Sequence, residues 1–448
     1  MFAILNSERE TIMKCITLIF LAFISVQNNL FASQSTDTDW QNYLSKYGLP
    51  STDQAYCYTD ETGAAIGTNI NSKIRLASVS KLITTLWAVN ELGAHYKYKT
   101  KLLISEGTLH IKGSFDPFFD NEKLYFLISQ LNDLGYDHFD KISFDSNLLI
   151  NLDARYHSEE YPDNSPVSIK KIIKNYFNTA NWSATLKQDF EAYRKIAAPG
   201  RIRANVNFSV TDVSFDDNYD SVTHENTREL TLASPEIVKY LKEMNIKSNN
   251  YIADTIFKQL GSNKFFNEFM LNNFQLNEDY IHFFSGSGLP VNINGSRFDN
   301  YSNCSTVVFL IYQLKLSLQK QNLDLENIVA VPGSDGGTFR NRTFPGDFKN
   351  TFVAKTGTLM HTSTLAGALN TNKGFSFFGI FNQTTDISSA KIVQNNMVST
   401  LMLEMGGPKT FSYTPGKFNT YSDENVYNKL AKSIFGEEKF RTYSEDLY

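Results

Sequence analysis

Ser78 and Lys81 stand three residues apart at the start of an apolar segment, and this pair could perform nucleophilic catalysis. Apolar residues recur at helical spacing from Leu82 to Leu92, and Gly93 follows as a natural helix end. Residues three apart share one face of a helix, so the amine lies within reach of the hydroxyl. A serine hydroxyl is a weak nucleophile near neutral pH, and an adjacent base activates it. The segment therefore predicts an activated serine at the N-terminus of a buried helix.

The Ser-x-x-Lys spacing is not specific by itself, because a solvated polar helix face produces it as well. It recurs at three other places, Ser168 to Lys171, Ser317 to Lys320 and Ser388 to Lys391. The Ser78 copy differs because a long apolar helix follows it at once and because two companion motifs lie downstream.

The companion motifs are Ser248-Asn249-Asn250, the only Ser-x-Asn in the chain, and Lys355-Thr356-Gly357-Thr358 after a strand-like run. Taken singly, the first is typical of a helix cap and the second of a turn. Together and in this order they match the Ser-x-x-Lys, Ser-x-Asn and Lys-Thr-Gly set of penicillin-recognising serine enzymes.

Longer segments extend the match. The chain resembles the class C low-molecular-mass penicillin-binding proteins, which are the D-alanyl-D-alanine carboxypeptidases and endopeptidases of peptidase family S13. The likeness covers most of residues 50–145 and 230–400, and it is carried by residues 107–117, 248–261, 285–289, 331–342 and 355–367.

The resemblance implies a role for each motif residue. Ser78 is the acylated nucleophile and Lys81 its base, while Ser248 relays a proton to the leaving amine. Asn250 binds the amide of the substrate. Lys355 anchors the terminal carboxylate and disfavours protonation of Lys81, because like charges repel.

The oxyanion and substrate-binding groups implied by the resemblance are Thr356, Gly357 and Thr358, with the N–H groups of Ser78 and Thr358 forming the oxyanion hole. The implied substrates are peptidoglycan stem peptides, with β-lactams as covalent inhibitors and no cofactor. No metal is indicated, since the seven histidines show no His-Glu-x-x-His pattern; we expect His361 to be a surface or packing residue.

The chain also departs from the family pattern. The stretch between Ser78 and Ser248 is shorter than usual, which suggests an open cleft that favours cross-linked polymer as substrate. Asp163 is the candidate for the acidic residue that contacts the diamino acid, and Ser285 replaces the usual aspartate. The tail after Gly407 looks like an addition.

Two other functions remain open. A β-lactamase would use the same catalytic set, but no glutamate can be assigned the deacylating role that class A enzymes require. A non-catalytic wall-binding or β-lactam-sensing protein is the second alternative, and the intact motif triplet argues against it.

The resemblance implies an α/β fold of the penicillin-binding-protein/β-lactamase-like transpeptidase type, with an antiparallel sheet flanked by helices, a helical subdomain and a reduced inserted domain. We expect a discontinuous DD-peptidase domain over residues 34–96 and 232–448 and a smaller α+β insert over 97–231. Local patterns predict strands over 54–59, 64–67, 98–105, 108–115, 351–354, 365–369 and 375–381 and helices over 118–135, 307–318 and 388–405.

Length, charge and the N-terminal segment indicate where the protein acts and which partners to expect. The chain has 448 residues and a formal net charge of -5, which gives no reason to expect nucleic acid as a partner. A secretory signal is predicted over residues 1–33, because Lys14 precedes an apolar run over 15–26 and small residues follow. The run is too short for an ordinary membrane span. We therefore expect export to the periplasm with no stable span afterwards; an uncleaved anchor is the alternative, and the start could be Met1 or Met13.

Two cysteines, Cys57 and Cys304, remain after the signal is removed. Export permits a disulfide, but two distant cysteines do not predict one. We expect two buried free thiols.

The mature protein is predicted to begin near Ser33, because the apolar run and the small residues after it specify cleavage there. N-terminal sequencing of the exported fraction checks this, and a sequence starting at Met1 would contradict export with cleavage.

Overall fold

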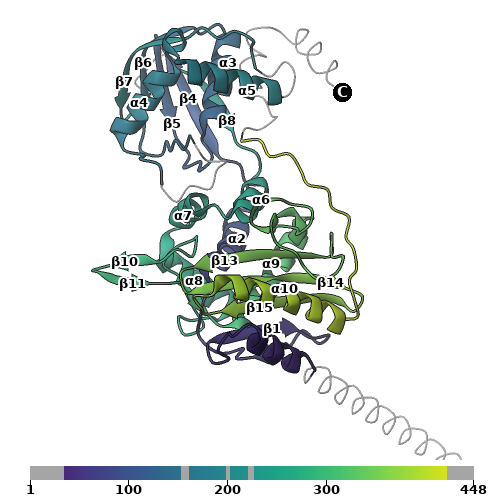
Figure 1. Cartoon of the computed structure of the whole chain (residues 1–448). Helices are drawn as coiled ribbons and strands as arrows, with labels where there is room; N and C mark the ends of the chain where they lie inside the picture. The colour runs from purple at the N-terminus through teal and green to yellow at the C-terminus, as the bar shows by residue number, and fades with distance from the viewer. Residues whose placement is uncertain (1–34, 153–160, 198–201, 220–226, 421–448) are drawn as a thin grey trace, which may run out of the picture.

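The computed structural model describes residues 35–152, 161–197, 202–219 and 227–420. The expected signal peptide lies outside these residues. Figure 1 shows two bodies, and a C-terminal segment that runs from the lower body toward the upper one. We call the lower one the catalytic body and the upper one the insert.

The catalytic body is built on a five-stranded antiparallel sheet in the order β13-β14-β15-β1-β2. The strands near the N-terminus are β1 (Gln54–Thr59) and β2 (Ala65–Thr68), joined by a turn. The strands near the C-terminus are β13 (Phe352–Leu359), β14 (Thr362–Thr371) and β15 (Gly374–Asn382). All five were predicted as strands; β1, β2 and β15 lie close to their predicted bounds, whereas the predictions over 351–354 and 365–369 cover half or less of β13 and β14. Because β13 is an edge strand, one side of its backbone faces away from the sheet.

Helices cover both faces of this sheet. Side chains alternate along a strand, so Tyr56 and Tyr58 of β1 join one core and Ala55 and Cys57 the other. The first core is closed by a helix over residues 35–46 and by α10 (Ile387–Glu404). The second is closed by α2 (Ser80–Glu91) and α9 (Cys304–Gln319).

A helical region packs on the outer side of α2. It contains α6 (Ile237–Lys247), α7 (Asn250–Gln259) and α8 (Ser262–Phe274). Trp87 of α2 is buried at its centre, with its ring edge-on to Phe257 and Phe266 at centroid distances of 5.4 and 5.5 Å. Short strands complete the body, namely β3 (Ile74–Arg75), β9 (Ile281–His282), β10 (Val291–Ile293), β11 (Ser296–Phe298) and β12 (Tyr301–Ser302).

The insert has its own mixed sheet, in the order β7-β6-β5-β4-β8, and its own hydrophobic core drawn from residues between Leu102 and Leu232. Its strands are β4 (Lys99–Ser105), β5 (Thr108–Lys112), β6 (His138–Phe144), β7 (Ser209–Phe215) and β8 (Arg228–Ala233). Its helices are α3 (Asn121–Asp133), α4 (Pro166–Tyr176) and α5 (Ala184–Ile196). The insert boundaries of 97–231 stay a prediction, and β8 and the core residue Leu232 extend just past the second boundary. Sequence patterns missed α4 and α5, which lie in a polar stretch.

Cys57 and Cys304 form a disulfide with a Cα–Cα distance of 5.9 Å, so the expectation of two free thiols is wrong. The bond joins β1 to the first residue of α9. A sequence separation of 247 residues leaves no local signal for this pairing, which the packing of α9 on the sheet creates.

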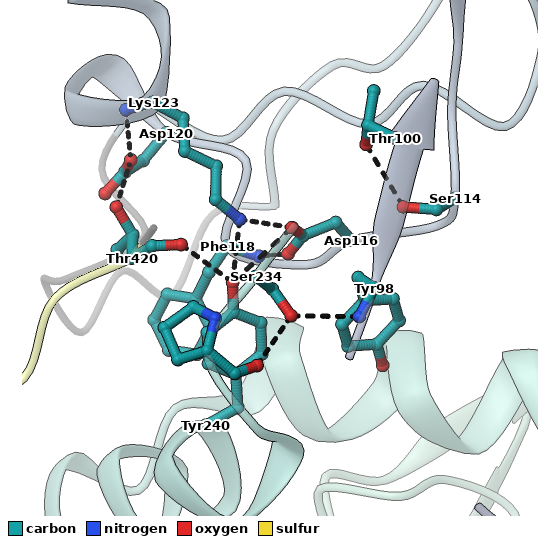
Figure 2. Close-up of polar contacts among 11 residues, drawn as sticks. Tyr98, Thr100, Ser114, Asp116, Phe118, Asp120, Lys123, Ser234, Tyr240 and Thr420 are labelled. Carbon is teal, nitrogen blue, oxygen red and sulfur yellow. Dashed lines mark hydrogen bonds and ion pairs between the residues drawn. The ribbon is translucent and has the colours of Figure 1, made fainter. Parts of the chain in front are cut away.

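Buried polar groups join the insert to the catalytic body, as Figure 2 shows. Lys123 of α3 donates to the carboxylate of Asp116 and, at 2.7 Å, to the hydroxyl of Tyr240 on α6. Tyr240 in turn donates to the Thr420 carbonyl at 3.1 Å, and the Thr420 hydroxyl donates to Asp120 at 2.9 Å. We call residues 408–420 the strap. The end of the strap, Thr420, therefore bonds to both bodies at their junction.

Ser234 also lies at this junction (Figure 2). Its hydroxyl accepts from the N–H of Tyr98 at 2.9 Å and donates to the Pro235 carbonyl. The helix α6 begins at Ile237, with Glu236 as its N-cap residue. Ser234 thus fixes the chain where it leaves the insert and does not cap the helix.

Lys123→Met should lower the free energy of unfolding by about 3–5 kcal/mol, because it leaves the buried Asp116 carboxylate without its counter-charge. The matched control is Lys101→Met, which breaks an exposed pair with Glu229 and should cost about 0–1 kcal/mol. Urea unfolding followed by circular dichroism measures both. Equal losses in the two variants would contradict the importance of the buried pair.

Candidate active site

Ser78 lies in a strained turn directly before α2. The turn is the 3-10 helix η1 (Ala77–Val79), and Ala77 has a φ of 47°, in the left-handed region that non-glycine residues avoid. Packing holds it there: the Thr364 hydroxyl donates to the Leu76 carbonyl at 2.9 Å, and a Cβ at Gly288 would lie 1.9 Å from the Ala77 carbonyl oxygen. The tightly held turn thus sets the position of the serine.

Lys81 is fully buried one turn later, and its amine donates to three oxygens. These are Ser78 Oγ at 3.0 Å, Asn250 Oδ1 at 2.8 Å and the Ser287 carbonyl at 2.8 Å. Burial lowers the pKa of Lys81 to about 7, against the opposing charge of Asp254. Near neutral pH a large share of the amine is therefore neutral and able to accept the Ser78 proton.

The Ser-x-Asn motif lies at the junction of α6 and α7. Ser248 ends α6 in the left-handed conformation, with a φ of 60°, and the side chain of Asn249 caps α7 by accepting from the N–H of Ile252 at 3.0 Å. The middle residue therefore does the capping. This leaves Ser248 and Asn250 free to turn toward the two lysines of the site.

Lys355 comes from β13 and is also fully buried. Its amine donates to Ser248 Oγ at 2.9 Å and to the Thr356 carbonyl at 2.7 Å. Burial, and secondly the charge of Lys81, hold the pKa of Lys355 well below its ordinary value. The charge of Lys81 thus disfavours protonation of Lys355, and an incoming carboxylate would stabilise the ammonium form of Lys355.

Gly357 lets the edge of β13 approach the nucleophile. A Cβ at this position would lie 2.2 Å from Thr364 Oγ1 and 2.9 Å from the backbone nitrogen of Ser78, so no other residue fits. The next residue, Thr358, is exposed. The strand edge thus lies against the Ser78 backbone, as an oxyanion hole made from the N–H groups of Ser78 and Thr358 requires.

The other Ser-x-x-Lys copies lack this arrangement in the described structure. The Ser168 hydroxyl donates to the carboxylate of Asp163, and the Ser317 hydroxyl bonds to the side chain of Asn90. Asp163 also accepts from Ser165 at 2.9 Å, next to the start of α4. Its carboxylate is therefore engaged at a helix start, and its proposed contact with a diamino acid stays a prediction. His361 is exposed on the β13–β14 turn, as expected.

Sequence reasoning missed three groups at the site. The Ser287 carbonyl accepts from Lys81, Asp254 accepts from the N–H of Ser287 at 2.7 Å, and Tyr161 of the insert donates to Asp254. The sequence offered one signal for placing Asp254 at the site, since it lies four residues after Asn250 and hence on the same face of α7. It offered no signal for Tyr161, because this residue comes from the other body.

Within the described residues, no cluster of three or more His, Cys, Asp or Glu side chains could hold a metal ion. The same part of the chain contains no helix that is both long and apolar enough to cross a membrane.

Comparisons with known proteins agree with this geometry. The family model of the D-Ala-D-Ala carboxypeptidase 3 (S13) family matches residues 58–189 and 219–402, well over half of the chain. Among solved structures, the predatory peptidoglycan endopeptidase Bd3459 from Bdellovibrio bacteriovorus is 28% identical, with a TM-score of 0.74, over 82% of this chain and 96% of that one.

Two further structures are similar. The predatory endopeptidase Bd0816 of the same bacterium is 29% identical, with a TM-score of 0.71, over 80% of this chain and 95% of that one. Penicillin-binding protein 4 from Haemophilus influenzae is 18% identical, with a TM-score of 0.54, over 81% and 99% of the two chains, and shares the fold. No curated protein matches the chain. The expected fold class is confirmed, and the chain belongs to the D-Ala-D-Ala carboxypeptidase 3 (S13) family of serine DD-peptidases.

Proposed function

We propose that this DD-peptidase is exported to the periplasm and hydrolyses D-Ala-containing peptide bonds of peptidoglycan through an acyl-enzyme on Ser78. The observation that carries the proposal is the 3.0 Å contact between Ser78 Oγ and the buried amine of Lys81. A neutral amine at that distance accepts a proton as the hydroxyl attacks.

The proposed reaction uses each motif in turn. The neutral amine of Lys81 takes the Ser78 proton while Oγ attacks the carbonyl carbon of the scissile D-Ala bond. The oxyanion lies between the N–H groups of Ser78 and Thr358. The C–N bond then breaks, Ser248 relays the proton held by Lys81 to the leaving amine, and an ester remains on Ser78. Water hydrolyses that ester and restores the free serine.

Substrate binding uses the remaining groups. Asn250 binds the substrate amide, and Lys355 holds the terminal carboxylate with help from Thr356 and Gly357. The buried setting of Lys355 supports this role, because an arriving anion would stabilise its ammonium form. The same groups would hold the carboxylate of a β-lactam.

The relatives support both the polymer substrate and covalent inhibition. Bd3459 is described as a peptidoglycan endopeptidase, and another of its structures is acylated by penicillin G. We extend both properties to this chain. Action on peptidoglycan requires a location outside the cytoplasm, which fits the signal predicted over residues 1–33. The β-lactamase and the non-catalytic sensor remain the competing functions.

The purified protein should cleave cross-linked muropeptide dimers into monomers as well as remove terminal D-Ala from pentapeptides. We expect both products because the stretch between Ser78 and Ser248 is proposed to be short for the family, which would leave room for a polymer strand. Chromatography of digested wall fragments measures both products. Release of terminal D-Ala without loss of dimers would remove the endopeptidase half of the proposal.

Ser78→Ala should abolish covalent labelling by a fluorescent penicillin and leave the fold intact, because it removes one hydroxyl from a turn that packing already holds. Ser168→Ala is the matched control, from the exposed Ser-x-x-Lys copy on α4, and should label fully. Stoichiometric labelling of the Ser78 variant would place the nucleophile elsewhere. Rapid nitrocefin turnover by the wild type would favour the β-lactamase.

A further inference from the structure

A chain of hydrogen bonds runs from the insert to the catalytic amine. The hydroxyl of Tyr161 donates to one oxygen of the Asp254 carboxylate, and the other oxygen accepts from the N–H of Ser287 at 2.7 Å. The carbonyl of Ser287 then accepts from Lys81 Nζ at 2.8 Å. Burial raises the pKa of Tyr161, so its phenol stays protonated and acts as the donor.

We propose that Asp254 is a positioning residue for Lys81 and that Tyr161 holds Asp254 in place, so that docking of the insert on α7 sets the reactivity of the catalytic amine. This inference rests on the proposed function, because it needs Lys81 to be the base for Ser78.

The geometry leaves the Ser287 peptide little freedom. Its turn lies between α2 and α7: the Thr84 hydroxyl donates to the Gly286 carbonyl at 2.8 Å, and a Cβ at Gly286 would lie 2.3 Å from the Ala253 carbonyl oxygen. Asp254 accepts from the Ser287 N–H, which shares a peptide plane with the Gly286 carbonyl, so this plane is bonded on both sides. The Ser287 carbonyl belongs to the next plane, whose N–H, that of Gly288, donates to Ser285 Oγ at 3.2 Å. Asp254 therefore fixes the backbone directly before the carbonyl that accepts from Lys81.

The charge of Asp254 on α7 acts on the amine of Lys81, and Tyr161 of the insert bonds to Asp254. Lys355 on β13 is the other buried amine of the site, and the charge of Lys81 lowers its pKa. The charge of Asp254 raises the pKa of Lys81 while burial lowers it. The balance of these two effects sets the pH above which the amine can act as a base.

Tyr161 belongs to a short contact between the insert and α7. Its ring lies edge-on to the ring of Tyr251 at 5.7 Å, and Asn164 donates to the Tyr251 hydroxyl at 3.0 Å. Tyr161 remains 45% exposed. The bond to Asp254 is therefore made by a partly exposed side chain that the insert positions. Through this bond the insert can influence the site although it does not contact Ser78.

The test measures the rate of acylation by a fluorescent penicillin as a function of pH. Asp254→Asn keeps an acceptor for the Ser287 N–H but removes the charge that raises the pKa of Lys81. The acidic limb of the pH profile of acylation should therefore move to lower pH by roughly one unit, while the rate at high pH changes little. Asp254→Ala also removes the acceptor, so the high-pH rate should fall at least about tenfold.

Tyr161→Phe should move the acidic limb the other way, to higher pH, because the carboxylate loses the hydrogen bond that offsets its charge. In the Asp254→Asn background, Tyr161→Phe should no longer move the limb. Asp279→Asn and Tyr280→Phe are the matched controls, since both residues are exposed and lie outside the chain of hydrogen bonds just described. Circular dichroism and melting temperature confirm that each variant is folded.

The outcomes separate the two levels of the proposal. If the wild type is not acylated, the proposed function fails and this inference falls with it. If the wild type is acylated but the Asp254 and Tyr161 variants behave like their controls, the proposed function stands and this inference is wrong. Equal rate losses at every pH in Asp254→Asn and Asp254→Ala, with no movement of the limb, would also overturn it.

Discussion

The burial of the Lys81 amine is the constraint on which the rest of the site depends. A fully buried ammonium loses several kcal/mol of solvation, and it is tolerated here because α2 presents it to oxygens from three other places in the chain. The same burial makes the amine a base near neutral pH. Stability and catalysis thus oppose each other at one atom, and the elements around Lys81 are arranged to hold it in spite of that cost.

Those elements meet by close backbone packing. Gly288 lies against the strained Ala77, Gly286 lies against α7, and Gly357 lies against Ser78, with no room for a Cβ at any of the three. Side chains would separate these segments and open the site to water. Rigid contacts of this kind explain how a non-glycine residue can hold a left-handed conformation directly before the nucleophile.

Features that are local in sequence could be predicted, and features created by tertiary packing could not. The motif at Ser78 was recognisable because hydroxyl, amine and apolar helix lie within one short segment, and β1 and β15 were recognisable as strand-like runs next to turns. The helix α4 is an exception, because its local signal was present and was missed: Ile169, Ile173 and Tyr176 recur at helical spacing after a Ser165 cap. The Cys57–Cys304 bond and the contact between Tyr161 and Asp254 join distant segments, so their partners exist only once the sheet and the insert are in place.

The insert meets the catalytic body at two places, and at both of them polar groups bond beside packed rings, Phe118 on Tyr240 and Tyr161 on Tyr251. Lys123, Tyr240 and Thr420 join them at one place, and Tyr161 and Asp254 at the other. Close-packed rings, buried hydrogen bonds and buried ion pairs all require a particular geometry, and the polar contacts are costly to leave unmade. The two junctions therefore specify one orientation of the insert over the catalytic body. That orientation is what places Tyr161 within reach of Asp254, and through Asp254 the insert contributes to the electrostatics of a lysine that it never contacts.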